Sequence, residues 1–172
     1  MTPVKLFCTD LDGTVFGNLE SMRRFKDAWE ALSPKQRPLL CYNSGRLLDD
    51  TLAVLETGAL PWQDYIIGGV GTQLYDARTK TVISDFDAQF GHGWDLEKIE
   101  QILAGFPGVS RQPPEFLHPY KSSWYLVHAS PETIDALRNQ LNDAGLDVNV
   151  IYSSSRDLDV VPRNTSKGHA LE

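Results

Sequence analysis

The apolar residues in the first half of the chain fall into short runs that are separated by helical stripes. Three short runs bounded by turn residues predict strands, at residues 6–8, 39–42 and 65–67. Two stretches between them carry apolar residues at helical spacing and predict helices, at residues 20–32 and 47–55. This order favours a parallel sheet with right-handed crossovers, and we expect the first strand to be buried on both faces. A hairpin is predicted to follow, from residues 73–76 and 81–84.

The pattern changes at about residue 85, where helix–strand–strand units replace the alternation of single strands and helices. Two helices are predicted here, at residues 96 to about 105 and 131–144. Four strands are predicted around them, at residues 110–112, 123–128, 147–152 and 158–161. Two such units are typical of a compact α+β module inserted in the first domain. We therefore divide the chain into the first part of a core, the inserted module and a return to the core, at residues 1–84, 85–161 and 162–172.

The composition is that of an ordinary globular protein of 172 residues with a formal net charge of -7. This charge argues against a nucleic-acid or anionic-membrane partner, although local cations can still accommodate an anionic substrate. We find no apolar stretch of membrane-spanning length and no signal peptide, and expect a cytoplasmic protein. The two cysteines, Cys8 and Cys41, lie in apolar runs and are expected to be buried free thiols, which fits a reducing compartment.

Two aspartates follow the first predicted strand. In extended backbone Asp10 and Asp12 point to the same side, and Gly13 lets the chain turn away. Two adjacent carboxylates repel each other, so either a proton or a cation such as Mg²⁺ is expected between them. With the metal present, one aspartate can attack a phosphoryl group and the other can handle the proton of the leaving oxygen. The alternative is a polar strand end with an Asp-Gly turn, which is the commoner explanation of an isolated pair.

The second predicted strand also ends in polar residues, Ser44, Gly45 and Arg46. A hydroxyl at a strand end, beside a glycine and the start of a helix, is suited to bind a phosphate oxygen. On its own this triplet would be an ordinary helix cap. Its position one strand after the aspartates favours a phosphate site, because open α/β sheets bind their ligands at the carboxyl ends of the strands.

The segment Asp10-Leu11-Asp12-Gly13-Thr14 resembles the first motif of the haloacid dehalogenase (HAD) superfamily of Mg²⁺-dependent phosphohydrolases. The resemblance extends along nearly the whole chain and is closest to the sucrose-phosphate phosphatase-like branch. It implies an α/β fold in which a HAD-like Rossmannoid parallel sheet carries an inserted α+β cap domain of αββ repeats. It also implies that Asp10 is the nucleophile, that Asp12 is the acid and base, and that both help to bind Mg²⁺.

Two further motifs carry the resemblance along the chain. Ser44 matches the second motif, in which a hydroxyl contacts the transferring phosphoryl group while Gly45 and Arg46 line the substrate side. Lys167, before Gly168, resembles the third motif, in which a lysine pairs with the nucleophile and offsets charge on the phosphoryl oxygens. A solitary lysine would instead be a surface charge.

Two segments of the predicted cap contain candidate substrate contacts. Lys121 lies among aromatic residues and is a suitable cation for an anionic or polyhydroxyl ligand. A solvated lysine beside core aromatics is the alternative, and the sequence leaves both open. Asp157 and Asp159 form a second pair of aspartates, which resembles the last cap strand of the branch. We assign this pair to the fold or to substrate contact rather than to the reaction centre.

The resemblance is incomplete near the last residue. The family needs a fourth, acidic motif downstream of the lysine, and the sequence ends at Glu172, five residues after Lys167. We therefore expect the chain to be truncated, with a sheet that is incomplete at the C-terminus and a deficient metal site, so that it could be inactive on its own.

The hypothesis that follows is a Mg²⁺-dependent phosphatase that hydrolyses a sugar phosphate, sucrose-6-phosphate-like or related, through an aspartyl-phosphate. One alternative is a phosphotransferase or mutase that passes the phosphoryl group to another sugar. Another is a sugar-phosphate-binding or regulatory protein without turnover. The expected partner is the small-molecule sugar phosphate, and we expect the protein to be a monomer.

Overall fold

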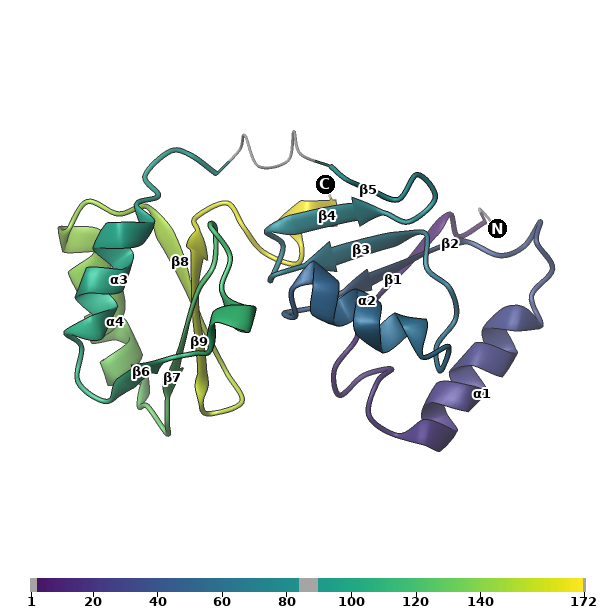
Figure 1. The fold of residues 1–172 in the computed structure, drawn as a ribbon, viewed down its shortest axis with the longest axis horizontal. Helices are drawn as coiled ribbons and strands as arrows, with labels where there is room; N and C mark the ends of the chain where they lie inside the picture. The colour runs from purple at the N-terminus through teal and green to yellow at the C-terminus, as the bar shows by residue number, and fades with distance from the viewer. Residues whose placement is uncertain (1–2, 84–89, 172) are drawn as a thin grey trace.

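Two β-sheets that lie side by side organise the molecule (Figure 1). The structure, a computed structural model, describes residues 3–83 and 90–171. In the first sheet the order is β1-β2-β3-β4-β5, with strands at Leu6–Asp10, Leu39–Asn43, Tyr65–Gly68, Gln73–Asp76 and Thr81–Val82. Strands β1 to β3 are parallel, whereas β4 and β5 add an antiparallel hairpin. The predicted α/β class is confirmed, although the sheet is mixed; Ser84, predicted as the end of the hairpin, lies outside the described residues.

Two helices connect the parallel strands, α1 at Leu19–Glu30 and α2 at Leu48–Glu56. Met22 and Trp29 are the buried residues of α1, and they form one core cluster with Leu40 and Tyr42 of β2. Buried residues of α2 join the same cluster, so both helices pack on one face of the sheet. The apolar stripes of the sequence therefore predicted the correct faces, because residues three and four apart share one side of a helix.

Strand β1 differs from the prediction that it is buried on both faces. The side chains of Leu6 and Phe7 are 41% and 40% exposed. The reason is the position of β1 at the end of the strand order, where β2 is its neighbour. An apolar run alone does not reveal whether a strand is central or terminal in its sheet. Both cysteines are free thiols as predicted, but Cys41 is buried and Cys8 only partly so.

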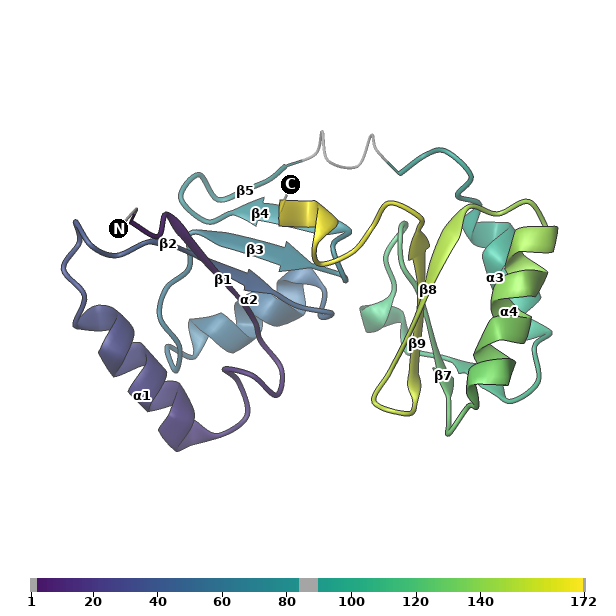
Figure 2. The ribbon, with the colours of Figure 1, turned by 180° about the vertical axis from the view of Figure 1, so that it is seen from behind.

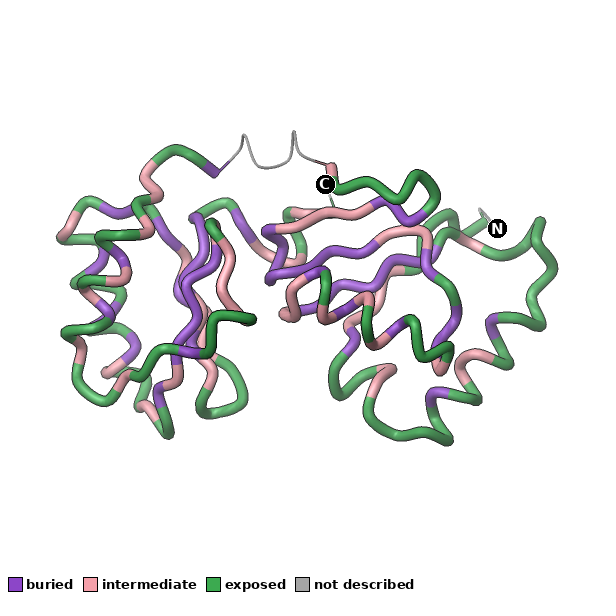
Figure 3. The backbone as a smooth tube through the Cα atoms, in the orientation of Figure 1, coloured by how far each residue is buried: buried purple, intermediate pink, exposed green. Residues whose placement is uncertain are grey.

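The second sheet is antiparallel and has the order β6-β7-β9-β8, with strands at Val109–Arg111, Ser122–Leu126, Asp157–Pro162 and Val148–Ser153. Helices α3 (Leu96–Ala104) and α4 (Pro131–Asp143) cover the face that points away from the first sheet (Figure 1). Their buried residues form a second core with the strands, and the buried positions follow both sheets in Figure 3. The predicted αββ repeat is present: α3 precedes β6 and β7, and α4 precedes β8 and β9.

The chain returns to the first sheet after β9. Residues 163–168 lead to a short 3-10 helix, η3 at His169–Leu171, which lies beside β4 (Figure 2). The division at residues 84 and 85 falls outside the described residues, so the three-part domain organisation stays a prediction. None of the helices within residues 3–83 and 90–171 has the length and apolar character needed to cross a membrane.

Candidate active site

Asp10 and Asp12 lie where β1 ends and the chain turns. Leu11 between them is fully buried, which leaves the two carboxylates on the side away from the core. Gly13 has a φ of +69°, and its N–H donates to the carbonyl of Phe16, which closes the turn. Both carboxylates line the same cavity, although β1 ends at Asp10 and Leu11 lies in a turn rather than in extended backbone.

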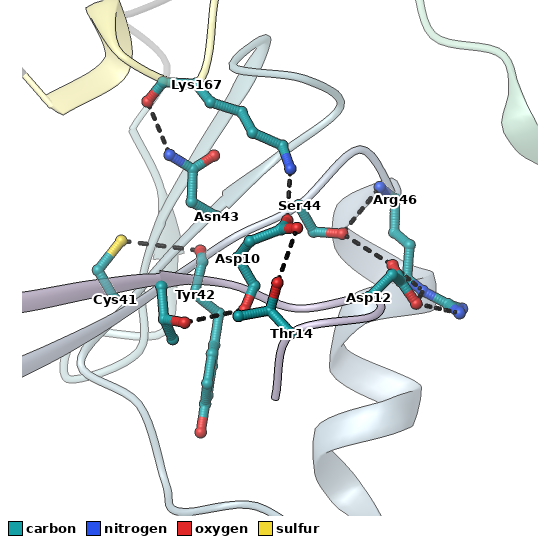
Figure 4. Close-up of polar contacts among 10 residues, drawn as sticks. Asp10, Asp12, Thr14, Cys41, Tyr42, Asn43, Ser44, Arg46 and Lys167 are labelled. Atoms are coloured by element: carbon teal, nitrogen blue, oxygen red, sulfur yellow. Dashed lines mark hydrogen bonds and ion pairs between the residues drawn. The ribbon is translucent and has the colours of Figure 1, made fainter. Parts of the chain in front are cut away.

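Lys167 lies 157 residues after Asp10 in the sequence, and its Nζ forms an ion pair with Asp10 Oδ1 (Figure 4). Two contacts fix the position of the Lys167 backbone. Asn43 Nδ2 donates to the backbone carbonyl of Lys167 at 2.7 Å. Gly71 has a φ of +97°, and a Cβ at this residue would lie 2.5 Å from the carbonyl oxygen of Ser166. Lys167 is therefore not a solitary charge, although its side chain is 41% exposed.

Ser44 and Arg46 approach Asp12 from the end of β2 (Figure 4). Ser44 is fully buried, and its Oγ donates to Asp12 Oδ2 at 3.4 Å and accepts from the N–H of Arg46 at 3.1 Å. The N-cap of α2 is Leu47 and not Ser44, so the alternative of an ordinary helix cap is wrong. Arg46 Nε and Nη2 donate to both oxygens of Asp12 at 2.8 to 3.0 Å. The hydrogen bond with Asp12 raises the pKa of Arg46 above its already high ordinary value.

Lys121 and Asp159 form a buried ion pair on the second sheet. Lys121 is 4% exposed, and its Nζ lies 2.8 Å from Asp159 Oδ1. Ser123 Oγ accepts from Lys121 Nζ at 2.5 Å and donates to Asp159 Oδ1 at 2.7 Å. The alternative of a solvated lysine is therefore wrong. A buried lysine is tolerated only when such partners compensate its charge.

One cavity of about 550 Å³ joins these groups, and both sheets contribute to its wall. The core wall has six residues: Asp10, Asp12, Gly45, Arg46, Asp50 and Lys167. The cap wall includes the predicted Lys121 together with Asp157 and Asp159. Of the predicted site residues only Ser44 is absent from this lining, because it is fully buried beneath Asp12.

Several lining residues were not among the predicted site residues: Asp50, Gln112, Phe116, Tyr125, Ser153, Ser154 and Arg156. Asp50 had a detectable signal, because it lies four residues after Arg46 on a predicted helix and the two side chains pair at 2.9 Å. The other six are on the second sheet and its loops. Nothing in their local pattern shows that this face turns toward the aspartates.

The residues of this cavity were tested against the Mg²⁺ that the first motif implies. Within residues 3–83 and 90–171, no three His, Cys, Asp or Glu side chains gather as a metal cluster. Mg²⁺ usually binds one or two protein carboxylates and completes its octahedron with water and substrate phosphate. Asp10 and Asp12 supply two carboxylates at one edge of the cavity, so the donor set fits that kind of site.

The chain resembles known phosphatases along nearly its whole length. A family model described as sucrose-6F-phosphate phosphohydrolase matches residues 3–172. The chain is 43% identical over 171 residues to mannosylfructose-phosphate phosphatase of Agrobacterium fabrum, and the match covers 99% of this chain and 69% of the relative. It is 28% identical to sucrose-phosphatase 1 of Nicotiana tabacum, with 96% of this chain covered but only 40% of the relative.

Two solved structures of phosphatases and related hydrolases have a similar fold. The sucrose-phosphatase of Synechocystis, solved in complex with sucrose and phosphate, superposes with a TM-score of 0.89 at 26% identity, over 99% of this chain and 68% of that chain. A haloacid dehalogenase-like hydrolase from B. subtilis has a TM-score of 0.64 at 14% identity, over 98% of this chain and 76% of that chain, and shows the fold alone. The chain therefore belongs to the sucrose-6F-phosphate phosphohydrolase family, whose members are sucrose-phosphatase-like phosphoric monoester hydrolases of the HAD superfamily.

Proposed function

We propose that this chain carries the reaction centre of a Mg²⁺-dependent phosphatase that hydrolyses a phosphorylated sugar through an aspartyl-phosphate. The observation that carries the proposal is the cavity between the two sheets. Its core wall places two carboxylates beside Lys167 and Arg46, and its cap wall adds Lys121 and polar side chains. Carboxylates with nearby cations suit phosphoryl transfer, and a polar opposite wall suits a polyhydroxyl leaving group.

In the first half of the reaction, Asp10 attacks phosphorus in line and the bond from phosphorus to the sugar oxygen breaks. The leaving sugar oxygen takes a proton from Asp12. In the second half, a water molecule gives a proton to Asp12 and its oxygen attacks the aspartyl-phosphate. Inorganic phosphate leaves and the Asp10 carboxylate is restored, so each group ends in its starting state.

Lys167 and Ser44 stabilise the charge that develops on the phosphoryl oxygens. Lys167 is within ion-pair contact of Asp10, and the Ser44 hydroxyl already donates toward the second carboxylate. Asp10 and Asp12 would hold Mg²⁺, which when bound offsets the negative charge shared by the carboxylates and the phosphate. Fixed donors and cations that surround the phosphoryl group lower the barrier because they need no reorganisation when the charge moves.

The cap wall is proposed to bind the sugar. Lys121, together with Gly45 and Arg46 on the core wall, lines the space in which the leaving group would lie. The ammonium of Lys121 is held by Ser123 and Asp159, so this cluster presents both donors and acceptors to sugar hydroxyls. A sugar resembling sucrose-6F-phosphate or mannosylfructose phosphate is the proposed class of substrate, after the names of the relatives.

Release of free phosphate from a panel of sugar phosphates tests this function. The panel contains sucrose-6F-phosphate, mannosylfructose phosphate and simple hexose phosphates, each with Mg²⁺ and with a chelator. The Agrobacterium fabrum enzyme serves as the positive control. We expect release by this chain only with Mg²⁺, and free phosphate rather than a new sugar phosphate as the product, which separates hydrolysis from phosphotransfer. No release under conditions in which the control is active would contradict the proposal.

One observation favours a second candidate, a sugar-phosphate-binding protein without turnover. Arg46 donates hydrogen bonds to both oxygens of Asp12, one of the two carboxylates that would hold the metal. Calorimetry with the same ligands separates the two candidates. Tight binding that is independent of Mg²⁺, without phosphate release, would support the binding protein.

A further inference from the structure

Arg46 is held from three sides at the edge of the cavity. Besides its two-pronged contact with Asp12, its Nη1 donates to Asp50 Oδ2 at 2.9 Å. Its guanidinium also lies over the ring of Phe16, 5.5 Å from the centroid. Asp12, Arg46 and Asp50 all line the cavity. One arginine therefore bridges two carboxylates that face the same space.

This bridge conflicts with the proton transfer proposed for Asp12. Both oxygens of Asp12 accept hydrogen bonds from Arg46, and Oδ2 accepts a further one from Ser44. A carboxylate engaged in this way has no oxygen free to present a proton to a leaving group. Arg46 must therefore release Asp12 before the sugar leaves. Asp50 is the group that can keep the guanidinium in the cavity when this happens.

We propose that Asp50 is a positioning residue, which holds Arg46 at the cavity and draws it off Asp12 when a sugar phosphate enters. Asp12 is then free for proton transfer, and the guanidinium turns toward the substrate. The inference rests on the proposed function and adds a residue outside the motifs of the family resemblance. Asp50 acts through Arg46, so its effect falls on the step in which Asp12 moves a proton.

The helix offers a simpler role for Asp50 and also a matched control. Asp49 and Asp50 both lie in the first turn of α2, where a carboxylate interacts favourably with the helix N-terminus. Asp49 is exposed and lies outside the lining of the cavity, whereas Asp50 is part of that lining. Asp49→Asn therefore makes the same charge change in the same turn without touching Arg46.

Steady-state phosphate release by three variants tests the positioning role. We expect Asp50→Asn to lower kcat about tenfold, the order of one charge-assisted hydrogen bond, and to change KM by less than about twofold. Asp50→Glu keeps a carboxylate within reach of Arg46 and should recover most of the kcat, and Asp49→Asn should keep all of it. A raised KM at unchanged kcat in Asp50→Asn would make Asp50 a substrate contact and overturn the proposal. Equal kcat values for Asp50→Asn and Asp49→Asn would overturn it too.

A measurement without turnover separates failure of this proposal from failure of the proposed function. If the unsubstituted chain releases no phosphate, the proposed phosphatase function is wrong. The contact of Asp50 with Arg46 can still be tested by NMR, through the Nε–H signal of Arg46 in nitrogen-15-labelled protein. Its loss in Arg46→Lys identifies the signal, and inorganic phosphate is the probe. We expect phosphate to shift the signal in the unsubstituted chain and in Asp49→Asn, and to leave it unmoved in Asp50→Asn. Equal shifts in all three proteins, or no shift in the unsubstituted chain, would overturn the proposal.

Discussion

Two Asp-x-Asp pairs face the same cavity, one on each wall, and their surroundings differ. Asp10 on the core wall pairs with Lys167, and these side chains are 42% and 41% exposed. Asp159 on the cap wall pairs with Lys121, and these are 14% and 5% exposed. An exposed pair can exchange partners with a substrate at little cost, whereas separating a buried pair leaves an uncompensated charge. The same local sequence can therefore serve the reaction on one wall and the fold on the other.

After the nucleophile itself, the largest effect that distinguishes the two walls is expected from Asp12→Asn. Loss of a general acid and base should lower kcat by about 10² to 10⁴-fold. The matched variant is Asp157→Asn, which changes the first aspartate of the pair on the cap wall. Asp157 forms an ion pair with the largely exposed Arg156, so its loss should lower kcat less than about tenfold. Phosphate release under saturating substrate measures both. Similar losses in the two variants would remove the distinction between the walls.

The next effect is on stability and concerns the buried pair. Asp159→Ala leaves Lys121 buried without its counter-charge, and should lower the free energy of unfolding by about 3 kcal/mol. Urea denaturation measures this. Asp157→Ala breaks a more exposed pair and should cost about 1 kcal/mol or less. The account of the cap wall fails if the two variants are equally stable.

A smaller change in stability is expected on the core wall. Lys167→Met removes the cation beside Asp10, but water and salt already screen this half-exposed pair. The free energy of unfolding should therefore change by less than about 1 kcal/mol. The same urea denaturation provides the measurement. A loss as large as that of Asp159→Ala would show that the core pair is structural as well.

The smallest predicted effect is a pH dependence of labelling, which reports on the strand that carries Asp10. The hydrogen bond with Cys41 lowers the pKa of Cys8 to about 7, while the same contact and burial raise the pKa of Cys41. The thiolate is the reactive form, so alkylation of Cys8 should rise as the pH increases through about 7, and Cys41 should stay unlabelled there. Iodoacetamide labelling followed by peptide mass spectrometry checks this. Equal labelling of both thiols would contradict it.

Much of the fold could be predicted because its signals are local. Apolar spacing located the helices and strands of both sheets, and the repeated helix–strand–strand order predicted the second sheet. Parallel pairing then places Asp10 opposite Asn43, so the residues that follow the two strands meet at one edge. The roles of the predicted site residues stay predictions, although six of the seven line one cavity.

The features that could not be predicted depend on long-range packing. The exposure of β1 follows from its terminal place in the sheet, which no apolar run encodes. The burial of Lys121 depends on Asp159 of β9. This strand pairs with β7, which begins one residue after Lys121, only in the folded chain. The contact of Arg46 with Asp12 spans 34 residues and needs both strand ends in register.

The central claim is that Asp10 is the group that reacts with phosphorus. Phosphate release by Asp10→Asn, beside the unsubstituted chain and with Mg²⁺ present, tests it most directly, with circular dichroism to verify that the variant is folded. We predict a folded protein whose release falls at least about 10³-fold, to the background of the assay. Substantial release by folded Asp10→Asn would contradict the assignment of Asp10 as the nucleophile.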